Sequence, residues 1–182
     1  KKIILLFVSL FVASVSFAQV VADWDKSLYV EQPDGTYTYP IVTDNNYSVV
    51  FTPGTLSDFV GGELLAFNAD GVPVSAPSVI AANGAGGAPV IGKDNNCSNC
   101  NHLPSPGDAL SFAILYNGDV IVITSLVPPV TYVASFFVNI DADNYGIEFT
   151  LPGGATVVKG CTDEAFLEYN AAANLSDGSC AT

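Results

Sequence analysis

The chain has 182 residues, of which 18 are acidic and five are lysine, so its formal net charge is −13 at pH 7. This balance excludes a nucleic-acid-binding protein, because phosphate contacts need lysine and arginine, and the chain has no arginine. With a single histidine as well, the chain holds few of the residues that hydrolases and phosphoryl-transfer enzymes use, and we expect no enzyme. The many Gly, Pro, Val, Tyr and Phe residues indicate an all-β protein with frequent turns.

Residues 1–18 have the pattern of a secretory signal peptide. Two lysines are followed by an apolar run from Ile3 to Val15, and Ser16 to Ala18 has the small residues of a cleavage site. A membrane anchor is the alternative, but the run is shorter than the ~20 residues that cross a bilayer. We therefore expect an exported protein, secreted or at the cell surface, without a membrane span in the mature chain. Three lysines would then face 18 acidic residues, giving a mature net charge of −15.

Residues 19–158 contain short β-type runs separated by turn signals. The segment around Pro33-Asp34-Gly35 predicts a first hairpin, and the turn at residues 68–71 predicts a second between residues 63–67 and 72–75. Further single strands are predicted at residues 47–52, 78–82 and 88–92.

The clearest local signal is a hairpin over residues 109–124. Its turn is Asn117-Gly118, the favoured pair for a two-residue turn, and Leu110, Phe112 and Ile114 share one face at period two. Residues 131–140 and 146–151 predict two more strands. Together the runs predict an antiparallel β-sandwich or jelly roll of eight to ten strands between Leu28 and Val158.

Residues 159–182 form a small C-terminal module with a cysteine near each end. Cys161-Thr162-Asp163, Tyr169-Asn170 and Asp177-Gly178-Ser179-Cys180 resemble the GCTD…NY…DGSC repeat of secreted and cell-surface proteins, many from Bacteroidota. That repeat is often likened to thrombospondin type 3 repeats. Cysteines of an exported chain pair in its oxidising surroundings, so we expect a Cys161–Cys180 disulfide. Such a bridge, closing about 20 residues, stabilises by roughly 3 kcal/mol in the chain-entropy model.

Two positions depart from the repeat. Glu168 stands where the family has Asn, and Ser176 stands where it has Asp, which weakens the calcium binding that the resemblance implies. Residues 47–151 are also similar to a β-sandwich module of secreted Bacteroidota proteins, although Gly62-Glu63 replaces its first Gly-Asp and Leu65 a usual Gly. That similarity implies a non-catalytic surface module.

Cys97 and Cys100 lie in a polar loop with His102, the only histidine. A structural zinc site needs four ligands, and the loop supplies three. A redox Cys-x-x-Cys begins a helix after a strand, which this loop does not resemble. A local Cys97–Cys100 disulfide is therefore our preferred interpretation.

Asp141, Asp143 and Glu148 are the candidate ligands for calcium, the one cofactor that the sequence suggests. Alternate carboxylates followed by a glycine echo the start of a calcium loop, but Tyr145 stands at its fifth position and no Glu follows at the twelfth. An ordinary turn between strands is the alternative.

Two functions remain after this reading. The first is a structural or adhesive module that pairs with itself or with other extracellular proteins, for which the uncharged run Val120–Ile140 would supply edge strands, unless that run is a buried strand pair. The second is a module that binds glycans or small ligands, assisted by calcium, with Trp24 and Tyr145 as candidate ligand-binding residues. Packing of Trp24 against the sandwich is the alternative at that position.

Overall fold

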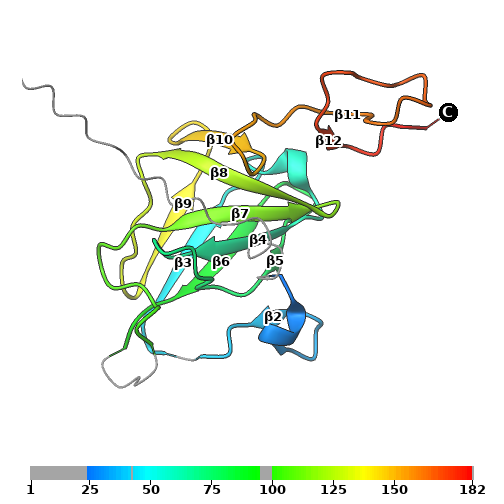
Figure 1. Cartoon of the computed structure of the whole chain (residues 1–182). Coiled ribbons are helices and arrows are strands. Elements are labelled where there is room, and N and C mark those ends of the chain that lie inside the picture. Colours follow the sequence, from blue (N-terminus) through cyan, green and yellow to red (C-terminus); the bar gives the residue numbers. More distant parts are fainter. Residues whose placement is uncertain (1–23, 42, 95–99, 182) are drawn as a thin grey trace, which may run out of the picture.

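The computed structural model describes residues 24–41, 43–94 and 100–181 and confirms the all-β class (Figure 1). A short 3-10 turn, η1 (Lys26–Leu28), precedes the first strand, and a second, η2 (Ser57–Phe59), lies between β3 and β4. The strands are β1 (Val30–Glu31), β2 (Tyr37–Thr38), β3 (Asn46–Phe51), β4 (Glu63–Phe67), β5 (Ser78–Val79), β6 (Gly86–Ile91), β7 (Ser111–Tyr116), β8 (Asp119–Val127), β9 (Phe136–Ile140), β10 (Gly146–Thr150), β11 (Lys159–Gly160) and β12 (Leu175–Ser176).

Two sheets pack against each other as a sandwich. One has the strand order β10-β8-β7-β4-β5 and is antiparallel throughout, and the other has the order β6-β3-β9. In the smaller sheet β3 is antiparallel to β6 but parallel to β9, which departs from the antiparallel prediction. Parallel neighbours need a long connection, and here the chain builds five strands between β3 and β9.

Two of the predicted hairpins form at the predicted positions. Asn117 and Gly118 have φ angles of 52° and 88°, so the tight turn joins β7 to β8 with Tyr116 opposite Asp119. The first hairpin pairs β1 with β2. The second differs, because residues 72–75 make only an isolated bridge between Phe67 and Pro73, and proline cannot donate to a ladder.

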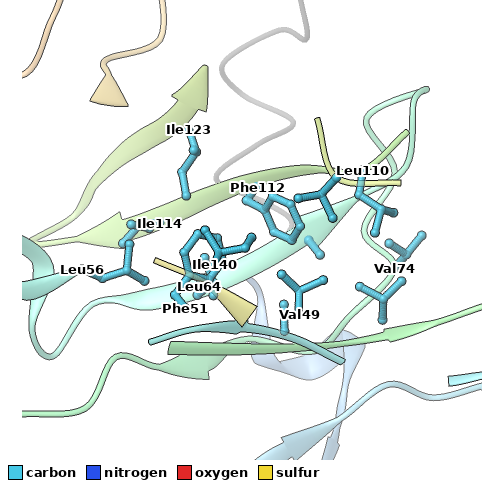
Figure 2. Packing of buried hydrophobic residues seen from close by; sticks show 14 of the residues in the cluster. Val49, Phe51, Leu56, Leu64, Val74, Leu110, Phe112, Ile114, Ile123 and Ile140 are labelled. Carbon is cyan, nitrogen blue, oxygen red and sulfur yellow. The ribbon is translucent and has the colours of Figure 1, made fainter. Parts of the chain in front are cut away.

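The main core lies between the two sheets (Figure 2). Phe112 and Ile114 are 1% and 0% exposed, which confirms the period-two face of β7. Phe51 of β3 meets Phe112 edge-to-face, with ring centroids 5.5 Å apart, and so joins the two sheets. Burying such side chains is what stabilises the sandwich, because each removes a large apolar surface from water.

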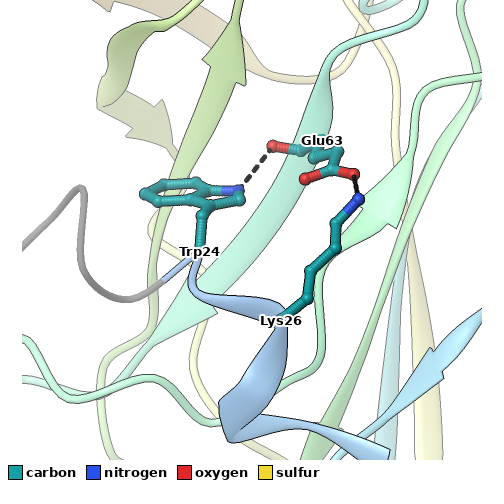
Figure 3. Close-up of polar contacts among 3 residues, drawn as sticks. All are labelled: Trp24, Lys26 and Glu63. Atoms are coloured by element: carbon teal, nitrogen blue, oxygen red, sulfur yellow. Dashed lines mark hydrogen bonds and ion pairs between the residues drawn. The ribbon is translucent and has the colours of Figure 1, made fainter. Parts of the chain in front are cut away.

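A second cluster covers the outer face of the five-stranded sheet. Trp24 and Tyr29, which precede the first hairpin, pack on Leu65 and Phe67 of β4. β4 is therefore buried on both faces, which accounts for an apolar run without alternation. The Trp24 indole donates to the Glu63 carbonyl at 3.2 Å, and Lys26 pairs with the Glu63 carboxylate at 2.6 Å (Figure 3).

The C-terminal module extends from the sandwich in Figure 1 and is closed by the Cys161–Cys180 disulfide, as predicted. Its strands β11 and β12 pair in parallel. Leu175 of β12 is fully buried and belongs to the main core cluster, so the module is anchored in the sandwich. Within the described ranges no helix is long and apolar enough to cross a membrane.

Candidate functional site

The edge strand β9 is the candidate site. β9 is the outer strand of the β6-β3-β9 sheet (Figure 1). The Ile140 carbonyl accepts from the Thr52 amide at 2.8 Å, so the backbone of Ile140 faces β3. Backbone groups alternate in direction along a strand. Those of Phe137 and Asn139 therefore point away from the sheet, toward any strand that adds to it.

Strand β9 begins with two apolar rings that are open to solvent. Phe136 and Phe137 are 61% and 58% exposed, and their rings stack with centroids 5.7 Å apart at an interplanar angle of 16°. Asn139 is exposed and Val138 is half-buried, whereas Ile140 is in the core. Exposed apolar strands at a sheet edge are uncommon in proteins that stay apart, because they template pairing with another chain.

The other edges of the two main sheets are short or covered. β5 has only two residues. The outer side of β6 is occupied at Ile91, whose amide donates to Val74, and carries Pro89, which has no N–H.

The outer side of β10 is covered as well. Val157 donates to the Phe149 carbonyl, and Thr156 bridges Thr150. A register shift at Glu148 further disturbs that edge. Among the residues that the structure describes, β9 is thus the edge of the main sheets that combines five residues, an unpaired outer side and no charge.

The run Val120–Ile140 was expected to form either edge strands or a buried strand pair, and the structure shows one strand of each kind. β8 lies inside the five-stranded sheet, where Ile121 and Ile123 are buried, so this half is a central strand. β9 is the edge. No charged residue occurs anywhere in the run. The sequence analysis did not single out Phe137 as an exposed residue. Two adjacent phenylalanines nevertheless break the in–out alternation of a strand, and this pattern indicates that one of them faces solvent.

The candidate calcium ligands are not brought together. One Asp141 carboxylate oxygen accepts from the amides of Asp143 at 3.1 Å and Asn144 at 2.8 Å, and the other accepts from the Asn144 side chain. These bonds lower the pKa of Asp141, chiefly through Asn144. Within the described ranges no group of three His, Cys, Asp or Glu residues could hold a metal ion. The expected site of Asp141, Asp143 and Glu148 is therefore corrected to a turn capped by Asp141.

Trp24 is not available to stack on a ligand. It is 5% exposed, its ring packs beside Phe67 with centroids 6.0 Å apart, and its N–H is already bonded. The packing alternative is the one observed at Trp24. Tyr145 is half-buried against the main core, whereas Trp24 belongs to the second cluster, so the structure does not bring these two residues together in a shared site.

The cysteine loop is described only in part. Cys100 is fully buried and disulfide-bonded, and none of the described cysteines is free. Cys97 lies outside the described residues, so the Cys97–Cys100 pairing stays a prediction. Nearby, the His102 ring nitrogen Nε2 lies 3.2 Å from the Tyr39 hydroxyl, which donates to Pro73. His102 thus helps to hold Tyr39, which follows β2, beside Pro73.

A shallow pocket of about 520 Å³ lies where the module joins the sandwich. Lys159 is its base. The Lys159 ammonium donates to the Asp58 carbonyl and lies 5.1 Å from the Tyr116 ring centroid and 5.7 Å from that of Phe59. The remaining lining residues are Ile147, Glu148, Phe149, Thr150, Thr156 and Val157. These side chains mix aromatic, acidic and hydroxyl groups, the chemistry that sugars and small polar ligands use.

Comparisons with family models, with curated proteins and with solved structures gave no match to this chain. The resemblance of the C-terminal module to the thrombospondin type 3-like repeat therefore stays a prediction.

Proposed function

We propose that this protein is an exported, non-catalytic structural or adhesive module that works by associating with copies of itself. The observation that carries the proposal is the free apolar edge of β9, with Phe136 and Phe137 more than half exposed. Removing such rings from water would favour association by about 25 cal/mol per Å² of apolar area buried.

The charge distribution supports the same proposal. A chain with 18 acidic residues and five lysines repels its own copies over most of its surface. The run that contains β9 is uncharged over 21 residues, from Val120 to Ile140, so copies can approach there with the least electrostatic cost.

Analytical ultracentrifugation over a concentration series tests the proposal. We expect reversible, concentration-dependent association of the wild type. Phe137→Lys should leave a monomer, because a lysine on an edge strand opposes strand pairing. Val79→Lys is the matched control, since Val79 is 63% exposed on the edge strand β5 and should keep the wild-type behaviour.

Thermal melting should show both variants folded, because each replaced side chain is mostly exposed. A wild type that stays monomeric at every concentration would reject the proposal. Equal losses of association from the two variants would mean that added charge, and not β9, is responsible.

A second candidate function is binding of a glycan or small polar ligand, and the pocket at Lys159 favours it. Phe149 would supply a ring for stacking, and Glu148 and Thr156 would supply hydrogen bonds. Titration calorimetry with neutral and amino sugars, comparing wild type with Phe149→Ala, tests it. Heat that is absent for every sugar, or unchanged by the substitution, would remove this candidate.

A further inference from the structure

We infer that two copies join through β9 and β9 alone, antiparallel and centred on Val138, to form a closed two-fold dimer with one continuous six-stranded sheet. This inference rests on the proposed self-association and adds the partner strand, the direction and the register.

The strand that pairs with β9 is identified by asking which sheet edges are open. A strand added to β9 must itself have an open outer side. In the described part of the chain β1, β2, β5, β11 and β12 have only two residues each, and the outer sides of β6 and β10 are occupied at Ile91 and Phe149. The matching edge is therefore β9 of a second copy. Identical patches that pair with each other give a closed two-fold contact and not a growing filament.

The direction follows from charge. Asp141 comes directly after β9, and Asp143 is close behind. A parallel pair would place the two Asp141 residues side by side, and like charges in that position are destabilising. In an antiparallel pair centred on Val138, Asp141 of each copy lies opposite Ser135 of the other, in an uncharged stretch.

The register follows from the backbone. Phe137 and Asn139 direct their N–H and C=O groups away from β3, as the Ile140–Thr52 bond requires. Centring on Val138 places Phe137 of each copy opposite Asn139 of the other, which gives two such pairs. Each such pair exchanges two hydrogen bonds, since both residues face outward. Centring on Phe137 would instead pair Asn139 with Ser135, whose positive φ of 55° interrupts the strand.

The side chains fit this register. Phe136 of each copy lies opposite Ile140 of the other, which covers a ring that is 61% exposed in the single chain. The two Phe137 rings are diagonal neighbours, at roughly the 7–8 Å spacing that aromatic side chains can bridge. The pairing therefore covers the two exposed rings without placing a charge against them.

Cysteine cross-linking tests the register. Residues opposite each other at the centre have Cα atoms about 4.5 Å apart, within the range that a disulfide spans. Val138→Cys should therefore be captured as a covalent dimer under mild oxidation. Asn139→Cys is the matched control, because its two copies would be diagonal neighbours, at roughly 7–8 Å and beyond disulfide reach.

A mixture of Phe137→Cys and Asn139→Cys copies gives a second, independent readout. Those side chains point outward, so neither replacement disturbs the core even if Val138→Cys does. The mixture should yield the mixed covalent dimer in at least tenfold excess over either homodimer.

The outcomes separate the two proposals. Cross-linking of Asn139→Cys as efficient as that of Val138→Cys, without the mixed dimer, overturns the register. A dimer in the ultracentrifuge that none of these cysteines captures overturns the pairing through β9 and leaves self-association standing. A monomer at all concentrations overturns both.

Discussion

Phe51 and Phe137 lie on strands β3 and β9 of the same small sheet, yet they have opposite surroundings. Phe51 is fully buried and packs edge-to-face on Phe112, whereas Phe137 is 58% exposed and stacks only on its neighbour Phe136. The difference comes from position, because Phe51 faces the second sheet and Phe137 faces away from it. The first therefore contributes to folding, and the second is available for the association that we propose.

The Asp141 side chain should make the stability of the fold depend on pH. Its hydrogen bonds to Asn144 and Asp143 lower its pKa below the usual 3.8. A carboxylate with a depressed pKa stabilises the fold above its unfolded pKa, and the contribution is lost as pH falls through the folded value. Asp141→Ala should therefore melt below wild type at neutral pH, and this gap should close below pH 3.8.

Thermal melting of the two proteins along a pH series measures this gap. Asp141→Asn is the control, because its side-chain oxygen still accepts from the two amides while the charge is removed. A gap of the same size at neutral and strongly acidic pH would show that the ionised carboxylate is not responsible.

At the scale of elements, the C-terminal module is tied to the sandwich in three ways. Leu175 is buried in the main core, Lys159 lies over two aromatic rings, and the Asn117 side chain donates to the Ser176 carbonyl at 3.1 Å. The sequence indicated a separate appendage, because the cysteine spacing and the turn residues are local features. The contacts of Leu175 are long-range and have no such signature.

Replacing both Cys161 and Cys180 with serine should loosen this module. The bridge joins cysteines 19 positions apart, and a loop of that size is worth roughly 3 kcal/mol. Hydrogen exchange should show faster exchange at Asn170, whose amide donates to Cys161, and unchanged protection in β7 and β8.

Leu167→Ser serves as the control, since Leu167 is 93% exposed in the same loop and the bridge stays intact. Lost protection in β7 and β8 would show instead that the sandwich cannot keep its core without the closed module.

How far the sequence predicts the fold depends on the range of each interaction. The Asn117-Gly118 turn, the face of Phe112 and the Cys161–Cys180 bridge were predicted from nearby residues. The parallel pairing of β3 with β9 was not, because it joins residues about ninety positions apart and has no local pattern.

The candidate calcium loop shows why a local pattern can mislead. Aspartate followed by backbone amides two and three residues on is what an Asx-type turn requires, and the same spacing begins a calcium loop. Only the positions of the other carboxylates distinguish the two, and they are set by the fold.

At the scale of the whole molecule, acidic self-repulsion governs the response to ions. Salt shortens the screening length from ~10 Å at 0.1 M to ~3 Å at 1 M. We therefore expect sodium chloride to raise the melting temperature and to strengthen association. At equal ionic strength, calcium and magnesium should give equal shifts, because the described carboxylates form no specific site.

Melting of the Asp141→Asn, Asp143→Asn double variant completes the comparison. It should respond to both ions as the wild type does. A shift that is specific to calcium and disappears in the double variant would restore the loop as a calcium site.

Trp24 is the only tryptophan in the chain, and it is sealed beneath the first hairpin on the outer face of the larger sheet. Its fluorescence therefore reports one docking event and not the state of the main core. Trp24 precedes β4, β7 and β8 in the chain, so its indole can dock only after these strands have paired. A blue shift in emission marks its arrival, and in a refolding experiment it should follow, not precede, the far-ultraviolet signal of the strands.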